Sequence, residues 1–319
     1  MTVMRASLLA LSRSRELQDL IVRLPALRRM ARRFVAGETL EDAIAAVLSL
    51  EEQGGHATLD HLGENTATEP EAIAAADEYL LALEALHAAQ VDQPAGGRSR
   101  CNASVKLTQM GLDLGEDFCT SNVSRILNLA QEHGNFVRID MEGSPYTERT
   151  LAIYRRLRQR FDNTGIVIQA YLHRSQADVE ALIAEGIGHF RLCKGAYDEP
   201  PDIAYREPQR VTQALNDLVR TCLEPLAMAR GAFAAVASHD EDVLNFVRAY
   251  AYQHGIPATA FEFQMLYGIR RELQARLMQQ GHTVRIYVPY GTHWYPYFMR
   301  RLAERPANLL FFLRALAGD

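Results

Sequence analysis

Strand-like and helix-like segments alternate along most of this chain. Short runs in which apolar residues fill every second position are followed by longer runs in which alanine and leucine recur every three or four residues. Residues 284–290 are typical, because Ile286 and Val288 share one face of a predicted strand that Pro289 and Gly291 end. The pattern predicts eight strands, at residues 57–63, 103–109, 136–142, 166–172, 189–196, 233–239, 259–266 and 284–290.

Helical spacing fills the intervals between these strands. Helices are expected at residues 69–90, 121–133, 145–161, 176–185, 210–229, 241–254, 268–280 and 294–305, and residues 1–50 also look helical. Eight strand–helix units in succession predict a parallel sheet closed into a (β/α)8 barrel. We therefore expect an α/β fold in which residues 1–55 form an N-terminal helical segment. That segment should pack on a barrel made by residues 56–319.

Polar residues occupy the second face of several predicted strands. Arg138 and Asp140 alternate with Val137 and Ile139, and other strands follow the same rule. If the apolar face meets the outer helices, the polar face lies inside the barrel, where it favours an active site over a stabilising core. The groups expected at the C-terminal mouth are Glu64, Lys106, Asp140, Glu142, Gln169, Arg191, His239, Glu262, Tyr287, Arg300 and Arg301.

Composition and charge limit the classes of protein to which this chain can belong. The chain has 319 residues, a hydrophobic content of 48% and a net charge of −5, which fits a sizeable core and gives no nucleic-acid footprint. Lysine occurs only at Lys106 and Lys194, while the other cations are arginine, so either these two positions need an ammonium group or the bias is chance. The arginine-rich residues 1–33 suggest a basic amphipathic helix. The four cysteines lack metal spacing and suggest a reducing compartment.

The candidate chemistry is anion binding. Adjacent Arg300 and Arg301 match the two oxygens of a carboxylate, although a solvated surface pair is the simpler alternative. No metal cluster, no GxSxG elbow and no GxGxxG turn occurs. Residues 190–196 end a strand in a cation and a glycine, where backbone N–H groups could hold a phosphate.

A set of motifs at these strand ends resembles the proline dehydrogenase family, including the proline dehydrogenase domain of bifunctional proline utilisation A. The resemblance covers roughly residues 55–317. It is carried by Leu-Gly-Glu at 62–64, Ser-Val-Lys-Leu at 104–107, Ile-Asp-Met-Glu at 139–142, Gln-Ala-Tyr at 169–171, Arg-Leu-Cys-Lys-Gly-Ala-Tyr at 191–197, Ala-Ser-His at 237–239, Glu-Phe-Gln-Met-Leu at 262–266, Arg-Ile-Tyr-Val-Pro-Tyr-Gly-Thr at 285–292, Tyr297 and the arginine pair.

The resemblance implies a distorted (β/α)8 barrel whose last helix lies over the C-terminal mouth. It also implies non-covalent FAD, oxidation of L-proline to Δ1-pyrroline-5-carboxylate, and transfer of electrons to a membrane quinone. No metal is implied. The sequence ends at Asp319 without an aldehyde dehydrogenase domain, so a separate pyrroline-5-carboxylate dehydrogenase is the expected consumer of the product. The expected location is the cytoplasm, with peripheral contact at the inner face of the membrane left open.

Residue roles follow from the same resemblance. Asp140 would orient the cations, and Arg191 would reach the flavin N5 region. Lys106, Arg300 and Arg301 would bind the substrate carboxylate. The proline ring would be walled by Ala196, Tyr197, Leu266, Tyr287 and Tyr297, and FAD would be lined by Met141, Gln169, Arg191, Lys194, Gly195, Ala196, Ser238 and His239.

Two positions raise further expectations. Glu64 ends the first strand, beside the last strand of a closed barrel, and is predicted to act as a gate by pairing with Arg300; a solvated acid is the alternative. Asp198 stands where bifunctional members of the family carry tryptophan, so the adenine end of FAD is expected to bind differently.

Three other functions are compatible with the same barrel. A lyase or aldolase would form a Schiff base on Lys106 or Lys194. A flavin barrel that acts on a folate would need a larger substrate site. A non-catalytic barrel that binds an amino acid would need no flavin.

Overall fold

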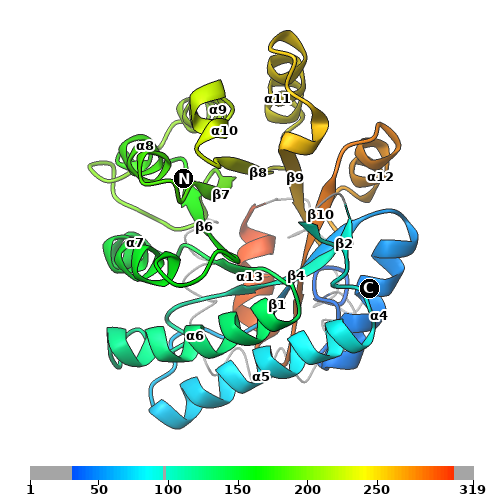
Figure 1. Cartoon of the computed structure of the whole chain (residues 1–319), viewed down its shortest axis with the longest axis vertical. Coiled ribbons are helices and arrows are strands. Elements are labelled where there is room, and N and C mark those ends of the chain that lie inside the picture. Colours follow the sequence, from blue (N-terminus) through cyan, green and yellow to red (C-terminus); the bar gives the residue numbers. More distant parts are fainter. Residues whose placement is uncertain (1–30, 96–97, 305–319) are drawn as a thin grey trace, which may run out of the picture.

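Eight parallel strands close into a barrel in the computed structural model, which describes residues 31–95 and 98–304 (Figure 1). The predicted basic helix at the N-terminus lies largely outside these residues. Each strand pairs with its sequence neighbours, and β1 closes the ring by pairing with both β10 and β4. The strands are β1 (His56–His61), β4 (Cys101–Val105), β5 (Val137–Ile139), β6 (Thr164–Gln169), β7 (His189–Cys193), β8 (Phe233–Ala237), β9 (Phe261–Leu266) and β10 (Val284–Tyr290). The predicted barrel is confirmed.

The helices that follow the strands form the outer ring seen in Figure 1. They are α5 (Glu69–Ala88), α6 (Glu116–Glu132), α7 (Ser144–Arg158), α8 (Ser175–Ala184), α9 (Pro208–Cys222), α10 (Pro225–Ala229), α11 (Glu241–Gln253) and α12 (Arg271–Gln279), with a single 3-10 turn, η1 (Ala258–Ala260), before β9. The sequence predicted one helix over residues 210–229. Two form instead, because Pro225 has no N–H to donate and disfavours a helical conformation at the residue before it.

A helix from before the barrel takes the place in the outer ring that a regular barrel gives to its last helix. The helix α4 (Leu40–Glu52) packs on the outside of β1 and β10, where Ala43 and Val47 join the main core. The last helix, α13 (Trp294–Glu304), lies across the middle of the ring in Figure 1. The position that α4 takes in the outer ring therefore leaves α13 free to cover the mouth.

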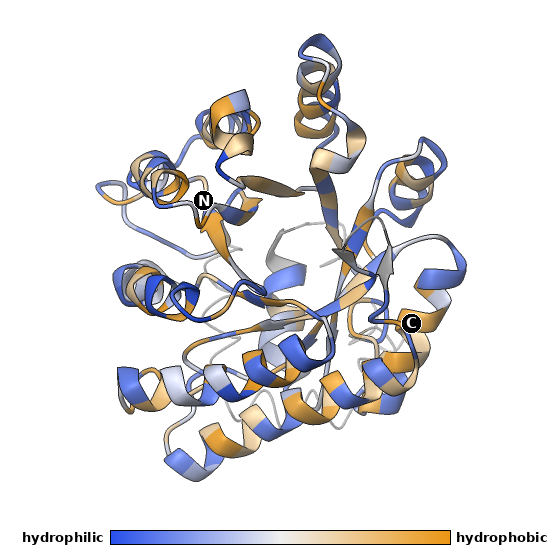
Figure 2. Cartoon of the chain, viewed as in Figure 1, coloured by the Kyte–Doolittle hydropathy of each residue, from blue (hydrophilic) through white to orange (hydrophobic). Residues whose placement is uncertain are grey.

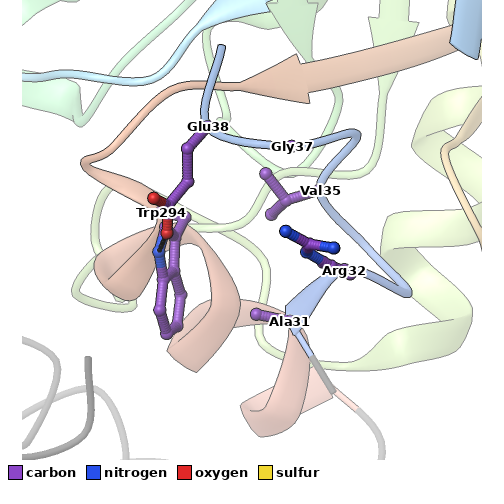
Figure 3. A pocket seen from close by; sticks show the side chains of 6 residues that line it. All are labelled: Ala31, Arg32, Val35, Gly37, Glu38 and Trp294. Atoms are coloured by element: carbon purple, nitrogen blue, oxygen red, sulfur yellow. Dashed lines mark hydrogen bonds between the residues drawn. The ribbon is translucent and has the colours of Figure 1, made fainter. Parts of the chain in front are cut away.

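Local sequence explains where α4 begins and how α13 is held. Thr39 and Asp42 form the capping box that their spacing predicts, so two N–H groups at the start of α4 are satisfied. A second apolar cluster joins α13 to the segment before α4, in which the Phe298 ring packs against Phe34 and Trp294. Figure 3 shows the Trp294 indole beside Glu38, whose carboxylate accepts its N–H at 3.2 Å.

The barrel separates apolar and polar faces as the alternation predicts. The outer faces of the strands and the inner faces of the helices make one continuous apolar core, seen as orange stripes on the helices in Figure 2. Polar contacts cross the interior instead. Arg191 on β7, for example, donates to the hydroxyl of Ser104 on β4, and these two strands are not neighbours in the sheet.

Several strands end earlier than the sequence predicts. Residues 106–109, 140–142 and 194–196 leave the sheet and form loops of the mouth. After β4 the chain turns, because Met110 N donates to the Lys106 carbonyl at 3.1 Å. After β7 it turns at Gly195, whose φ of +115° lies outside the strand region.

The floor of the barrel holds a buried ion pair that the sequence placed at the mouth. Glu262 stands at the start of β9, so its predicted position at the C-terminal end is wrong. It accepts the Arg285 Nε–H at 2.9 Å, and Arg285 also donates to the carbonyls of Ala57 and Ser99 at 2.8 and 3.0 Å. Ser99 belongs to a short hairpin of β2 (Pro94–Ala95) and β3 (Arg98–Ser99), which the sequence analysis did not predict.

Replacing Glu262 by glutamine should destabilise the fold. Burial raises the pKa of Glu262, but Arg285 and the hydrogen bonds it accepts outweigh burial and bring the pKa to about 2. Glu262→Gln leaves Arg285 buried without its anion, which costs about 3–5 kcal/mol. The pair stabilises the fold above the unfolded pKa of glutamate, ~4.3, and loses this effect as the pH falls toward 2. The loss measured by urea unfolding at pH 7 should therefore shrink below about pH 4.

The matched control is Glu241→Gln, which removes an exposed carboxylate paired with Arg270 and Arg276. It should leave the unfolding free energy nearly unchanged, because water solvates the separated partners. Equal losses in the two variants would contradict the assigned role of the floor pair.

Candidate active site at the barrel mouth

A cleft of about 640 Å³ opens at the carboxyl ends of the strands, beneath α13. Its walls contain every residue predicted from the sequence to bind substrate or cofactor, to catalyse or to gate: Glu64, Lys106, Asp140, Met141, Gln169, Arg191, Lys194, Gly195, Ala196, Tyr197, Ser238, His239, Leu266, Tyr287, Tyr297, Arg300 and Arg301. Their roles stay predictions, but the fold brings them together. Glu142 and Glu262, also expected at the mouth, do not line it.

Asp140 lies at the centre of the polar wall, directly after β5. Its carboxylate accepts hydrogen bonds from Arg191 Nη1 and from the Tyr287 hydroxyl, both at 2.8 Å. The ammonium group of Lys106 is 3.6 Å away. Asp140 therefore draws together three groups that come from β7, β10 and the loop after β4.

Lys106 has a closer anion that the sequence analysis missed. Its Nζ donates to Asp60 Oδ1 at 2.6 Å and to the Tyr287 hydroxyl at 3.3 Å. Burial acts to lower the pKa of Lys106, but Asp60, Asp140 and Glu64 together raise it above its ordinary value, so the ammonium form persists. The available signal was alternation, because Asp60 follows Thr58 by two residues on the polar face of β1.

Arg191 is held by a second missed residue, Gln264. The Arg191 Nε–H donates to Gln264 Oε1 at 2.5 Å, and Nη2 donates to Ser104 at 2.9 Å. The Gln264 amide in turn donates to Glu262 at 2.5 Å. Glutamine alternates with glutamate on β9, so the inward phase of that strand was visible in the sequence, whereas the link to Arg191 was not.

The α13 side of the cleft contains the arginine pair. Arg300 binds both oxygens of Glu64, at 2.5 and 3.1 Å, so the predicted contact is present. The Arg301 guanidinium lies 5.1 Å from the centre of the Tyr297 ring. Glu64 and Arg300 thus connect the end of β1 to the helix over the mouth.

Glu142 does not line the cleft but holds the loop after β4 in place. It accepts the N–H of Thr108 at 3.1 Å and the hydroxyl at 2.6 Å. Burial raises the pKa of Glu142 to about 6, and the two bonds from Thr108 limit the rise. Glu142 therefore fixes the loop after β4 and does not face the cleft.

The opposite side of the cleft could hold a phosphate-bearing ligand. Lys194 is one-third exposed and pairs with Asp240 at 2.6 Å, and Thr212 accepts its second bond at 2.8 Å. The amide of Gln169 accepts the Ala196 N–H at 3.4 Å, which shapes the loop around Gly195. This wall combines a cation and a glycine-containing loop with apolar side chains, a mixture that suits a ligand with both phosphate groups and an apolar ring system.

Two further observations bear on ligands. Across residues 31–95 and 98–304, no group of histidine, cysteine and acidic side chains is arranged to hold a metal ion. Asp198 does not line the cleft. It pairs with Arg206 at 3.2 Å at an exposed position, so this side chain, expected to change the binding of adenine, turns away from the cleft.

Enzymes built on a closed (β/α)8 barrel have their active sites at the carboxyl ends of the strands, and this chain has a cation-rich cleft at that place. The family model for proline dehydrogenase matches residues 43–314. Proline dehydrogenase 1 of Bacillus subtilis subsp. natto is 42% identical over 286 residues, which are 90% of this chain and 90% of that protein. Proline dehydrogenase of Deinococcus radiodurans is 39% identical over 292 residues with the same coverage. The chain belongs to the proline dehydrogenase family, an enzyme family of oxidoreductases that act on proline.

Structural comparison supports the fold. Proline utilization A (PutA) from Bdellovibrio bacteriovorus matches with a TM-score of 0.81 at 24% identity, over 93% of this chain and 38% of that chain. The described residues contain no helix with the length and low charge that crossing a bilayer demands.

The loop at Gly195 should not tolerate a side chain. A Cβ there would lie 2.3 Å from the Tyr171 ring, in addition to the strain of a positive φ. Gly195→Ala should therefore destabilise the fold by ~1–3 kcal/mol more than Gly186→Ala, through overpacking. Gly186 is the matched control, since its φ is +73° and nothing lies within 4 Å of the added carbon. Urea unfolding of both variants measures the difference, and equal losses would mean that Tyr171 moves aside freely.

Proposed function

We propose that this protein oxidises L-proline to Δ1-pyrroline-5-carboxylate, with FAD as cofactor and a quinone as electron acceptor. The observation that carries the proposal is the cleft itself, in which Lys106, Arg300 and Arg301 lie among tyrosine rings at the mouth of a proline dehydrogenase-family barrel. An amino acid with an apolar ring and a carboxylate has the matching chemistry.

The cations would bind the carboxylate. Glu64 takes two of the five N–H donors of Arg300, so others are available to a ligand. Lys106 has three N–H donors, of which Asp60 and Tyr287 take two. Because both cations are already held by fixed partners, they are oriented before the substrate arrives, which lowers the entropic cost of binding.

The ring would be held by side chains that stay neutral. Burial and the nearby Asp140 raise the pKa of Tyr287 well above its ordinary value. Burial and Glu64 do the same for Tyr197. Neutral phenols pack against apolar groups, and in the proposal Tyr297, Leu266 and Ala196 complete the wall. Asp140 is engaged by Arg191 and Tyr287, so we assign it to orientation of these groups.

The donor set of the opposite wall fits FAD. Lys194 and the loop at Gly195 would hold the phosphates, and Arg191 would face the ring system. The remaining residues proposed to line the cofactor are Met141, Gln169, Ala196, Ser238 and His239. The chemistry that FAD supplies, when bound, is acceptance of the electrons removed from the substrate.

A Schiff-base reaction fits the site less well. Lys106 and Lys194 each lie 2.6 Å from an aspartate, so both nitrogens are engaged in ion pairs. Burial opposes the ammonium form of Lys106, yet three nearby acids raise its pKa, and a protonated amine is not a nucleophile.

The wider proposal draws on the family resemblance. It names a separate pyrroline-5-carboxylate dehydrogenase as consumer of the product and a cytoplasmic location with peripheral contact at the membrane.

Anaerobic titration tests the central proposal. The purified protein should show a flavin absorption spectrum, and L-proline should bleach it under nitrogen. D-proline is the control, because it has the same charge and size but presents its hydrogen from the other side. A flavin spectrum that saturating L-proline leaves unchanged would contradict the proposal.

We propose further that the Glu64–Arg300 pair is a gate, which holds α13 over bound substrate. Glu64→Ala should raise KM for proline by about 5- to 30-fold and slow flavin reduction, because losing a partly desolvated pair costs ~1–2 kcal/mol, between the exposed and buried limits. FAD affinity should not change. Stopped-flow reduction at several proline concentrations measures the effect.

Glu185→Ala is the matched control for the gate. Glu185 binds the Arg155 Nε–H with both oxygens, but this pair lies outside the cleft. It should leave KM and the reduction rate at wild-type values. If Glu64→Ala behaves in the same way, Glu64 does not gate the mouth.

A further inference from the structure

Asp60 is a buried carboxylate that would not touch the substrate in the proposed chemistry. It lies in β1 with 0% of its surface exposed, and it is not part of the cleft wall. One oxygen, Oδ1, accepts the Lys106 ammonium at 2.6 Å. Asp60 therefore reaches the substrate site only through Lys106.

Folding does not explain this carboxylate. Among the described residues its second oxygen, Oδ2, has no hydrogen-bond partner, and the Tyr79 hydroxyl lies 3.4 Å from Oδ1. A buried charge with an unsatisfied oxygen destabilises a protein, and an apolar pair of similar size often serves as well or better. The arrangement therefore calls for a function beyond stability.

The groups around Lys106 show what that function is. Asp140, 3.6 Å away, is shared with Arg191 and Tyr287, so its charge is largely engaged. Asp60 is the closest anion. Other charged and titratable groups also act on the ammonium. These are Glu64 and His61 from the segment at the end of β1, and Tyr287 on β10. Arg191 on β7 contacts the same Tyr287 ring.

We propose that Asp60 is the positioning residue for Lys106: it keeps the buried amine charged and fixed where it can bind the substrate carboxylate. This inference rests on the proposed oxidation of proline and deepens it. Without the charge of Asp60, burial is opposed only by Glu64 and by Asp140, which Arg191 and Tyr287 also engage, so the pKa of Lys106 should fall. Because the ammonium form is the one that binds a carboxylate, substrate affinity is then lost as the pH rises.

The two-lysine composition allows a direct test on the full-length holoenzyme. Incorporation of lysine labelled with ¹³C at the ε carbon gives two signals, and Lys106→Met assigns them. In the wild type the Lys106 signal should stay that of an ammonium group up to pH 10. In Asp60→Asn its titration midpoint should fall at least ~2 pH units below the wild-type value, in the direction that burial gives a lysine. An unchanged midpoint would overturn the proposal.

Steady-state kinetics tests the positioning role of Asp60 in a second way. KM for proline in Asp60→Asn should rise at least ~10-fold between pH 7 and pH 9, while the wild-type value changes far less. In a Lys106→Met background, Asp60→Asn should add almost nothing, because its effect passes through the lysine. Additive effects of the two substitutions would refute the proposal.

Asp92→Asn is the matched control. Asp92 is another buried aspartate, 1% exposed and paired with His87 at 2.9 Å, and it lies outside the cleft. Its loss should leave the Lys106 signal and the pH dependence of KM unchanged. If Asp60→Asn does not fold, Asp60→Ser, which leaves room for water, replaces it in both experiments. The two proposals fail separately, because a wild-type flavin that proline does not reduce ends the first, while the titration of Lys106 judges only the second.

Discussion

Charged side chains inside a closed barrel have no bulk water to solvate them, so each must be compensated by another group of the protein. This constraint shapes the whole interior. The buried pair of Arg285 and Glu262 orients the amide of Gln264, and this amide orients the guanidinium of Arg191. The guanidinium shares the carboxylate of Asp140 with the ammonium group of Lys106, which has Asp60 as its closest anion. The chain of contacts from floor to mouth runs through Arg285, Glu262, Gln264, Arg191, Asp140, Lys106 and Asp60.

The network has a consequence for the chemistry. Asp140, Lys106 and Arg191 at the mouth each have at least two polar partners, so their positions are determined before a ligand binds. Such a cleft binds substrate with little further ordering of its charged side chains. In the proposed reaction a C–H bond breaks, which depends on orientation of the reacting atoms, and cations that bind the substrate carboxylate away from the reacting carbon would supply that orientation.

The place of α13 depends on the other end of the chain. A last helix in the ordinary position would pack outside β10 and β1, but α4 covers that surface with Ala43 and Val47. The apolar cluster around Phe298 then fixes α13 across the mouth, and the pair with Glu64 joins its far side to β1. The arginine pair reaches the cleft only because of this exchange.

Sequence pattern predicted much of this arrangement, since alternation within strands and the order of the elements depend on neighbouring residues. It placed Asp140 and Arg191 in the mouth and anticipated the contact between Glu64 and Arg300. It did not predict correctly how far along the barrel axis a residue lies. The inward phase of Glu262 is clear from alternation, but whether it lies at the floor or the mouth depends on the residue at which β9 begins. Asp60 was missed because its partner lies in another strand–helix unit.

The choice of lysine at position 106 follows from the same network. The nitrogen lies between Asp60 at 2.6 Å and Asp140 at 3.6 Å, with the Tyr287 hydroxyl at 3.3 Å. A compact ammonium group fits among three oxygen acceptors, whereas the planar guanidinium that serves elsewhere in this chain is larger and directs its donors in one plane. An arginine would have to displace Asp140 or Tyr287, and Asp140 could then no longer hold Arg191. The lysine is therefore a requirement of the shared carboxylate, which connects the rare residue in the composition to the geometry of the site.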